Sequence, residues 1–238
     1  MKVSIIIPAH NEEDFLVETL THVCALTYPD FEVIVVDNAS TDRTSEIARE
    51  FPVLVVHEKT KGLLHARECG RRHAKGEIIA NIDADCLPEP DWLTKGIHYF
   101  SDPHVVSVSG PYDYYDSKSW FRSLSSLVQA HGFSALSRFL SRIGKQGVMI
   151  GGNNLIRARV LELVGGYNTQ ILFYGEDTDT AKRVSKEGKI VFDRHFVMKS
   201  SGRRFKHHGV VSIFFLYVYH FLKVSFFSKS KNAHASKN

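Results

Sequence analysis

The chain has 238 residues, of which 43% are hydrophobic and 24% are charged; this length suits one large α/β domain, or one domain with an attached segment, and the composition excludes an intrinsically disordered chain. All 26 acidic residues lie at or before Asp193, whereas nine of the 30 basic residues follow it, so the C-terminal part predicts an anionic partner. The three cysteines, Cys24, Cys69 and Cys86, show neither zinc spacing nor a disulfide pattern, which favours a reducing compartment.

Strand and helix signals alternate over the first hundred residues. Apolar runs at residues 3–7, 33–36, 53–56 and 78–82 predict four strands, of which the first is expected to be buried on both faces and the second to be buried as well. Helical spacing predicts a helix after Asn11, which is expected to cap it, and further helices at residues 43–50 and 63–74. The first apolar run is too short for a signal peptide. This order predicts an α/β fold with a mostly parallel sheet and right-handed crossovers.

The pattern becomes less regular after about residue 110. Residues 117–143 have helical spacing, with breaks expected at Gly132 and Gly144. Residues 147–168 are predicted to form a strand, a glycine-rich bend and a helix, and residues 174–188 a loop that leads into a helix. We therefore expect a main domain over residues 1–200, with halves at 1–112 and 113–200, and a basic hydrophobic segment over residues 201–238.

Two aspartates, Asp83 and Asp85, follow the fourth predicted strand. Alternate side chains on a strand point the same way, so the two carboxylates share a face and repel unless a cation or a shared proton relieves them. Carboxylates suit Mg²⁺ or Mn²⁺, and open α/β sheets bind ligands at the carboxyl ends of their strands. The pair therefore predicts a metal that holds a phosphate-bearing substrate. The alternative is that both residues only end the strand and cap the next helix.

Six motifs occur in one order along the chain: VSIIIPAHNEE, VIVVDNASTDRT, KGLLHARECGRRHAKGE, NIDADCLPEPDWL, GGNNLIRARVLELVGGYN and GEDTDTAKRV. Together they resemble the family 2 glycosyltransferases over residues 2–195. The resemblance implies the GT-A fold, a Rossmann-like, mostly parallel sheet flanked by helices. It also implies an inverting transfer of sugar from a nucleotide diphosphate sugar, most often a UDP-sugar, with Mg²⁺ or Mn²⁺ as cofactor.

The resemblance also implies roles for individual residues. Asp37 would bind the base, and the D-x-D pair would meet the ribose and the metal-bound diphosphate. The general base would be Asp177, with Glu176 or Asp179 as alternatives. The implied nucleotide-sugar site consists of Pro8, Ala9, His10, Glu12, Asp37, Gly62, Arg67, Asp83, Ala84 and Asp85, of which Asp83 and Asp85 are the metal ligands. Gly151, Gly152 and Asn153 would shape the acceptor side.

Three residues depart from the family pattern. Glu68 stands where asparagine is frequent, Cys86 where a third acid is frequent, and His10 where an aromatic is frequent; they leave the sugar and the nucleotide open. The alternatives to sugar transfer are nucleotidyl transfer and an inactive nucleotide-sugar-binding protein at a membrane. The first strand is not followed by the glycine- and arginine-rich signature of nucleotidyltransferases, and the retained acids argue against an inactive protein. No G-x-G-x-x-G follows that strand either, which argues against a dehydrogenase.

Residues 210–227 form an apolar run flanked by basic residues on both sides. As a helix it would be roughly 27 Å long, slightly short for a membrane span, and positive charge at both ends does not suit one crossing. We expect a helix that lies on the anionic inner face of the cell membrane, so that the protein is cytoplasmic and peripheral. A transmembrane helix and a buried or homodimer-forming helix are the alternatives. The surface helix would suit a lipid-linked acceptor, whose phosphate Arg203 and Arg204 would meet; no nucleic acid is expected as a partner.

Overall fold

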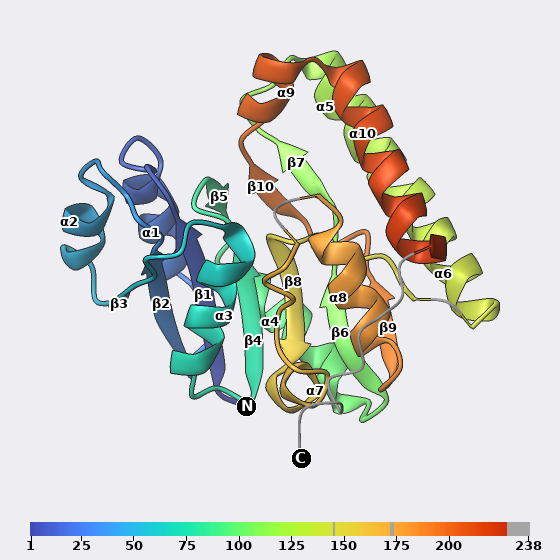
Figure 1. The fold of residues 1–238 in the computed structure, drawn as a ribbon, viewed down its shortest axis with the longest axis horizontal. Helices are drawn as coiled ribbons and strands as arrows, with labels where there is room; N and C mark the ends of the chain where they lie inside the picture. Colours follow the sequence, from blue (N-terminus) through green and yellow to red (C-terminus); the bar gives the residue numbers. More distant parts are fainter. Residues whose placement is uncertain (145, 172–173, 228–238) are drawn as a thin grey trace.

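A computed structural model describes residues 1–144, 146–171 and 174–227, and in this part of the chain the main sheet has seven strands. Their order across the sheet is β3 (Leu54–His57), β2 (Phe31–Asp37), β1 (Val3–Ala9), β4 (Ile78–Ile82), β8 (Asn153–Arg157), β6 (Val105–Ser109) and β9 (Lys189–Phe192). Strand β8 runs antiparallel to both neighbours, and all the other pairs are parallel. The sheet is therefore mixed but mostly parallel, as the sequence predicts (Figure 1).

Helices cover both faces of this sheet (Figure 1). One face packs against α1 (Leu16–Cys24), α2 (Thr44–Arg49), α4 (Trp92–Ile97) and the short 3₁₀ turn at His98–Ser101. The other face packs against α3 (Leu63–His73), α7 (Ala158–Leu163) and α8 (Glu176–Val184). The domain is thus a three-layer α/β structure.

The alternation of side chains along each strand produces the two cores. On β1, Ile5 and Ile7 belong to the first core, while Ile6 between them belongs to the second. A strand buried on both faces needs apolar residues at every position, which is why these strands are recognisable as continuous apolar runs.

A smaller sheet lies above the carboxyl ends of the main strands. It consists of β5 (Cys86–Leu87), β10 (Met198–Ser200) and β7 (Tyr112–Tyr114). The chain continues from β10 into α9 (Arg203–His208), α10 (Val210–Leu222) and a π-helical turn at Lys223–Phe227. Among the described residues, no helix is long and apolar enough to cross a membrane.

A long helical segment runs beside this C-terminal segment. It consists of α5 (Ser119–Leu127), a π-helical stretch at Val128–Phe133, and α6 (Ser134–Arg142). At one end the rings of Phe121 and Phe205 are 5.0 Å apart, and just beyond the other end Gln146 donates a hydrogen bond to Ser225. The predicted break at Gly132 is a π-helical stretch, whereas the break at Gly144 is a true end, since Gly144 has a φ of 68°.

Two local predictions are wrong. Residues 147–168 contain a glycine turn followed by β8 and α7, not a strand followed by a bend and a helix. The strand was missed because it begins with Asn153 and Asn154, whose polar side chains are buried and hydrogen-bonded. Asn11 does not cap α1, which begins at Leu16; Asn11 has a φ of 53° and accepts a hydrogen bond from the Thr41 amide.

Candidate functional site

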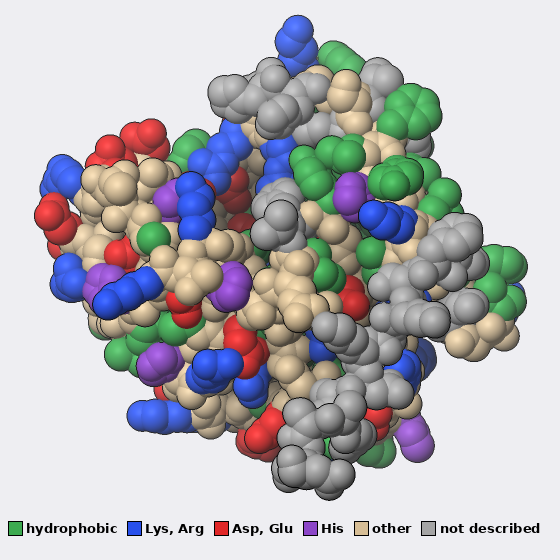
Figure 2. Space-filling view, viewed as in Figure 1, with side chains coloured by type: hydrophobic (Ala, Val, Ile, Leu, Met, Phe, Trp, Pro, Cys, Tyr) green, Lys and Arg blue, Asp and Glu red, His purple; other side chains and the backbone are tan. Residues whose placement is uncertain are grey.

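A cavity of about 560 Å³ lies between the carboxyl ends of β1 and β4, the small sheet and the start of α9. It brings together most of the residues that the sequence assigns to the nucleotide-sugar site. Pro8, Ala9, His10, Glu12, Gly62, Asp83, Ala84 and Asp85 all line it, together with Arg203 and Arg204 from the C-terminal segment. Figure 2 shows blue side chains of arginine and lysine beside red acidic ones in this hollow.

Asp83 is held by two side chains that flank it. Arg67 donates from Nη2 to Oδ1 over 2.9 Å, and the Tyr112 hydroxyl donates to Oδ2 over 3.1 Å. Arg67 is buried and does not line the cavity. Arg67 therefore lies behind Asp83 and holds its carboxylate, although the resemblance includes Arg67 in the nucleotide-sugar site.

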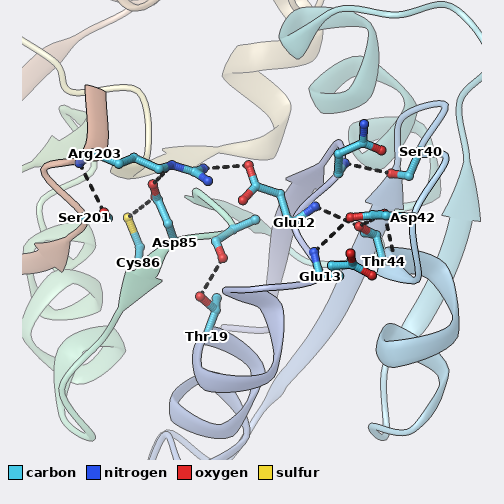
Figure 3. A network of polar contacts seen from close by, with 12 residues as sticks. Glu12, Glu13, Thr19, Ser40, Asp42, Thr44, Asp85, Cys86, Ser201 and Arg203 are labelled. Atoms are coloured by element: carbon cyan, nitrogen blue, oxygen red, sulfur yellow. Dashed lines mark hydrogen bonds and ion pairs between the residues drawn. The ribbon is translucent and has the colours of Figure 1, made fainter. Parts of the chain in front are cut away.

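Asp85 has a different partner. Arg203 Nε lies 3.0 Å from Asp85 Oδ2, and Arg203 Nη2 lies 2.6 Å from Glu12 Oε1 (Figure 3). Burial and the neighbouring Asp83 raise the pKa of Asp85 to about 6, although Arg203 opposes this shift. The second Glu12 oxygen, Oε2, is buried without a hydrogen-bond partner.

These carboxylates fit a divalent cation. Across residues 1–144, 146–171 and 174–227, no group of three or more His, Cys, Asp or Glu side chains is arranged to hold a metal ion by itself. Mg²⁺ and its relatives commonly bind one or two carboxylates, with water and substrate phosphates in the remaining positions. Asp85, with its raised pKa, and the unpartnered oxygen of Glu12 supply that kind of incomplete oxygen site beside Asp83.

Asp37 lies at the end of β2 but is not among the residues that line the cavity. Its Oδ2 is 3.0 Å from His57 Nδ1, and its Oδ1 accepts a hydrogen bond from the Ser40 amide. The next residue, Asn38, does line the cavity, and its amide joins the loops after β2 and β3 by contacts to Glu58, Thr60 and Gly62. Sequence reasoning missed Asn38, although it lies within the motif that supplied Asp37.

The glycine turn at Gly151 and Gly152 packs directly against the site. A Cβ on Gly152 would lie 2.2 Å from Asp83 Oδ2 and 2.4 Å from the Tyr112 hydroxyl, so no larger residue fits there. Asn153 is fully buried, and its amide contacts Trp92 and the carbonyls of Pro111 and Phe196. The turn therefore shapes the site through its backbone, while the Asn153 side chain faces the protein interior.

Glu176 and Asp177 form the first turn of α8. Burial, followed by the charge of Asp177, raises the pKa of Glu176 to about 8, and burial also raises the pKa of Asp177. The charge of Arg67 lowers the pKa of Glu176 and that of Asp83 raises it, and neither Glu176 nor Asp177 lines the cavity. Asp179 is committed to a buried ion pair with Arg183 at 2.8 Å.

The three departures from the family pattern have separate structural explanations. Glu68 receives two hydrogen bonds of 2.8 Å from Arg71 and one from the Tyr167 amide, so it joins α3 to the loop before α8. Cys86 is buried, and its sulfur is 3.9 Å from Asp85 Oδ1. His10 contacts the Asn38 carbonyl at 2.8 Å and faces the cavity.

Comparison with known proteins identifies relatives of this arrangement. The model of the family described as Glycosyl transferase family 2 matches residues 4–165. A curated relative, "Glycosyltransferase AglE" of Haloferax volcanii, is 29% identical over 82% of this chain and 65% of its own length. The "Dolichol-phosphate mannosyltransferase" of Pyrococcus furiosus is 36% identical over 47% of this chain and 34% of its own length. The chain thus spans less than two thirds of each of these relatives.

A solved structure shares the fold over most of the chain. The mannosyltransferase PcManGT from Pyrobaculum calidifontis, in complex with GDP-Man and Mn²⁺, superimposes with a TM-score of 0.69 and 25% identity. The match covers 92% of this chain and 64% of that one. The predicted GT-A architecture is therefore confirmed.

Proposed function

The chain belongs to glycosyl transferase family 2, and we propose that it transfers a sugar from a nucleotide diphosphate sugar, a UDP-sugar in the first instance, to a lipid-linked acceptor with inversion at the anomeric carbon. The observation that carries this proposal is the cavity that joins Glu12, Asp83, Asp85 and Arg203 at the carboxyl ends of β1 and β4. Family membership favours sugar transfer over nucleotidyl transfer or an inactive binding protein.

In the proposed reaction, the anomeric carbon gains positive character as the nucleotide diphosphate departs. Asp177 takes the proton of the acceptor hydroxyl or phosphate as that oxygen attacks from the opposite face, with Glu176 beside it. Asp85, with Asp83 held in place by Arg67 and Tyr112, would hold Mg²⁺ or Mn²⁺. A cation bound there supplies a Lewis acid that neutralises the diphosphate.

The donor is testable directly. We expect the purified protein to bind and slowly hydrolyse one class of donor from a panel of UDP-glucose, UDP-N-acetylglucosamine, UDP-galactose and GDP-mannose. Mn²⁺ or Mg²⁺ should be required, so a chelator should abolish the hydrolysis. Release of UDP or GDP measures turnover, and thermal shift measures binding. If no member of the panel shifts the melting temperature or is hydrolysed with either metal, these donors are ruled out.

The proposed acceptor rests on a second feature, the exposed apolar side chains of α5–α6 and α10. Several large ones are at least 45% exposed on α5–α6 and just past its end: Trp120, Leu124, Leu127, Val128, Phe139 and Ile143. Those on α10 follow helical spacing: Phe215, Val218, Tyr219 and Leu222. Figure 2 shows apolar side chains gathered over α10 and along the edge of the molecule beside it. We refer to these residues together as the apolar helical surface.

The charged residues around the apolar helical surface favour a membrane over a protein as its partner. Residues 117–161 and 194–238 contain no aspartate or glutamate. Exposed basic residues flank the apolar side chains: Lys118, Arg122, Arg138, Arg142 and Lys223. Exposed aromatic and aliphatic groups with a basic margin are typical of helices that lie in an anionic bilayer surface. We therefore propose peripheral binding at the cytoplasmic face of a membrane, where a lipid-linked acceptor would reach the cavity.

Liposome flotation tests this surface. We expect the chain to float with vesicles that contain anionic phosphatidylglycerol, less so with pure phosphatidylcholine, and less at high salt. The double substitution Trp120→Ser with Leu127→Ser should weaken the partitioning about tenfold, since two apolar groups no longer enter the bilayer. The control is Val17→Ser with Leu163→Ser, which removes two apolar side chains that are about half exposed, on α1 and α7, away from this surface. A soluble dimer that ignores both kinds of vesicle would instead make the apolar helical surface a protein interface.

A further inference from the structure

Arg203 occupies the place where the proposed cation would bind. Its Nε is 3.0 Å from Asp85 Oδ2 and its Nη2 is 2.6 Å from Glu12 Oε1, so one guanidinium bridges the two carboxylates (Figure 3). Sequence reasoning assigned Arg203 to the acceptor side. Its contacts are with Glu12 and Asp85 of the proposed donor site, and Oδ2 is one of the two Asp85 oxygens that a metal could bind.

The backbone that carries this arginine is anchored on the small sheet side. The Gly202 amide donates to Asp116 Oδ1 over 2.6 Å, and the Ser201 hydroxyl donates to Asp116 Oδ2 over 2.9 Å. The guanidinium also lies over the ring of Phe15, 4.4 Å from its centroid. The base of the side chain is therefore fixed, while its charged end remains about one-third exposed toward the cavity.

A guanidinium and a divalent cation cannot share Asp85 at low cost. Both are positive, and the site is partly buried, so their repulsion is screened less than in water. A metal that takes Asp85 Oδ2 would displace Arg203, which then needs another anion. The diphosphate of a donor supplies one in the same cavity, and arginine binds phosphate oxygens well through its planar fork.

We propose that Arg203 gates the metal site. While the donor is absent, the Arg203 guanidinium pairs with Asp85 and Glu12. When metal and donor bind together, the guanidinium moves to the diphosphate of the donor. This inference rests on the metal-assisted donor site proposed above. It makes binding of the metal and of the nucleotide cooperative. By linkage, each then raises the affinity of the other by the same factor.

The test is metal binding rather than turnover. Arg203→Gln keeps a polar side chain of moderate length and removes the charge. Titration of Mn²⁺ alone, followed by the electron paramagnetic resonance signal of the free ion, should show about tenfold tighter binding to this variant than to the wild type. Titration of UDP and of GDP in the presence of Mn²⁺ should show weaker nucleotide binding to the variant. The cooperativity between metal and nucleotide should fall correspondingly.

Arg204→Gln is the matched control, because Arg204 also lines the cavity and donates a hydrogen bond to the Tyr217 hydroxyl, and its charge lowers the pKa of Asp85 less than that of Arg203 does. It removes the same charge from the same region and should tighten Mn²⁺ binding much less. If Mn²⁺ binding tightens equally in both variants, the cause is the loss of a positive charge from the region rather than the loss of Arg203 itself. That result would overturn the gate. Unchanged or weaker Mn²⁺ binding to Arg203→Gln would also overturn it. If Arg203→Gln binds Mn²⁺ more tightly but the wild type turns over no nucleotide sugar, the gate is supported and the proposed reaction is wrong.

Discussion

Asp85→Asn should abolish metal-dependent donor binding and reduce transfer by roughly a thousandfold, corresponding to about 4 kcal/mol of lost stabilisation of the departing diphosphate. Asp85 lies between β4 and β5 and lines the cavity, and its carboxylate is the group that the proposed cation would contact. An amide keeps the shape of the side chain but loses the charge. Isothermal titration of donor with Mn²⁺ measures the binding, and release of nucleotide diphosphate measures the turnover.

The control for this variant is Asp91→Asn, a nearby surface carboxylate that pairs with Lys95 at 2.8 Å and lies outside the cavity. It should behave like the wild type in both measurements. Thermal unfolding in the presence of a chelator should also be similar for the two variants, which would show that Asp85→Asn is folded. Full activity of Asp85→Asn, or of the wild type in excess chelator, would contradict a metal role for this carboxylate.

Asp177→Asn should reduce turnover by about a hundredfold or more at every pH, while nucleotide-sugar binding is largely retained. The reason is that a carboxamide cannot accept the acceptor's proton. Glu176→Gln should retain more activity if Asp177 is the base. A matched control is Asp179→Asn, which alters the buried pair with Arg183 and should lower the melting temperature more than it lowers turnover per folded molecule. Lost donor binding with preserved turnover of bound donor would assign Asp177 a structural role instead.

The same pair of acids predicts how activity depends on pH. Burial and the charge of Asp177 raise the pKa of Glu176 to about 8, and burial raises the pKa of Asp177, so at neutral pH the pair retains a proton. A general base must be ionised, and burial raises the pKa of Asp177, so kcat/KM should rise with pH from a point above the usual range of an aspartate. In Glu176→Gln, Asp177 ionises without a like charge beside it, so the rise should move to lower pH. A profile that is flat in the wild type, or that is the same in Glu176→Gln, would contradict this.

Stability should follow the opposite trend over this range. The folded protein binds the Glu176 proton more tightly than the unfolded chain does, because the folded pKa of about 8 lies above the ordinary value of 4.5. The folded state is therefore favoured below pH 4.5 by this group, and that contribution is lost as pH rises toward 8. Glu176→Gln should remove this loss, and chemical unfolding at pH 5 and pH 8 would measure it.

Much of the fold could be predicted because β1, β2 and β4 are buried along most of their length, while the edge strand β3 is apolar but partly exposed. Residues 3–7, 33–36, 53–56 and 78–82 are apolar at nearly every position, and each corresponds to a strand of the main sheet. Strand β8 was missed because buried amides, not apolar groups, occupy its first two positions. Their hydrogen-bond partners lie on distant parts of the chain, such as Asn81 and Trp92, and no local pattern reveals them.

The site residues that lie within recognised sequence motifs could be predicted. Contacts between residues that meet only in the folded chain could not. The cavity contains the predicted loop after β1 and both aspartates after β4. Tyr112, which holds Asp83, follows no motif that the sequence analysis recognised. The ion pair of Glu12 with Arg203 joins residues 191 positions apart, so only the folded chain could show it. The roles of the individual residues in binding and transfer stay predictions.

The distance along the chain between Glu12 and Arg203 has a consequence during biosynthesis. Strands β3, β2, β1 and β4 all come from the first 82 residues and can pair while the ribosome is still translating. At about 5–20 residues per second, Glu12 is made roughly 10–40 s before Arg203. During that interval a nascent chain carries the acids of the metal site without their arginine. If Arg203 gates the metal site as proposed, a polypeptide released before α9 should bind divalent cations with no donor present, and the synthesis of α9 would make cation uptake conditional on the nucleotide.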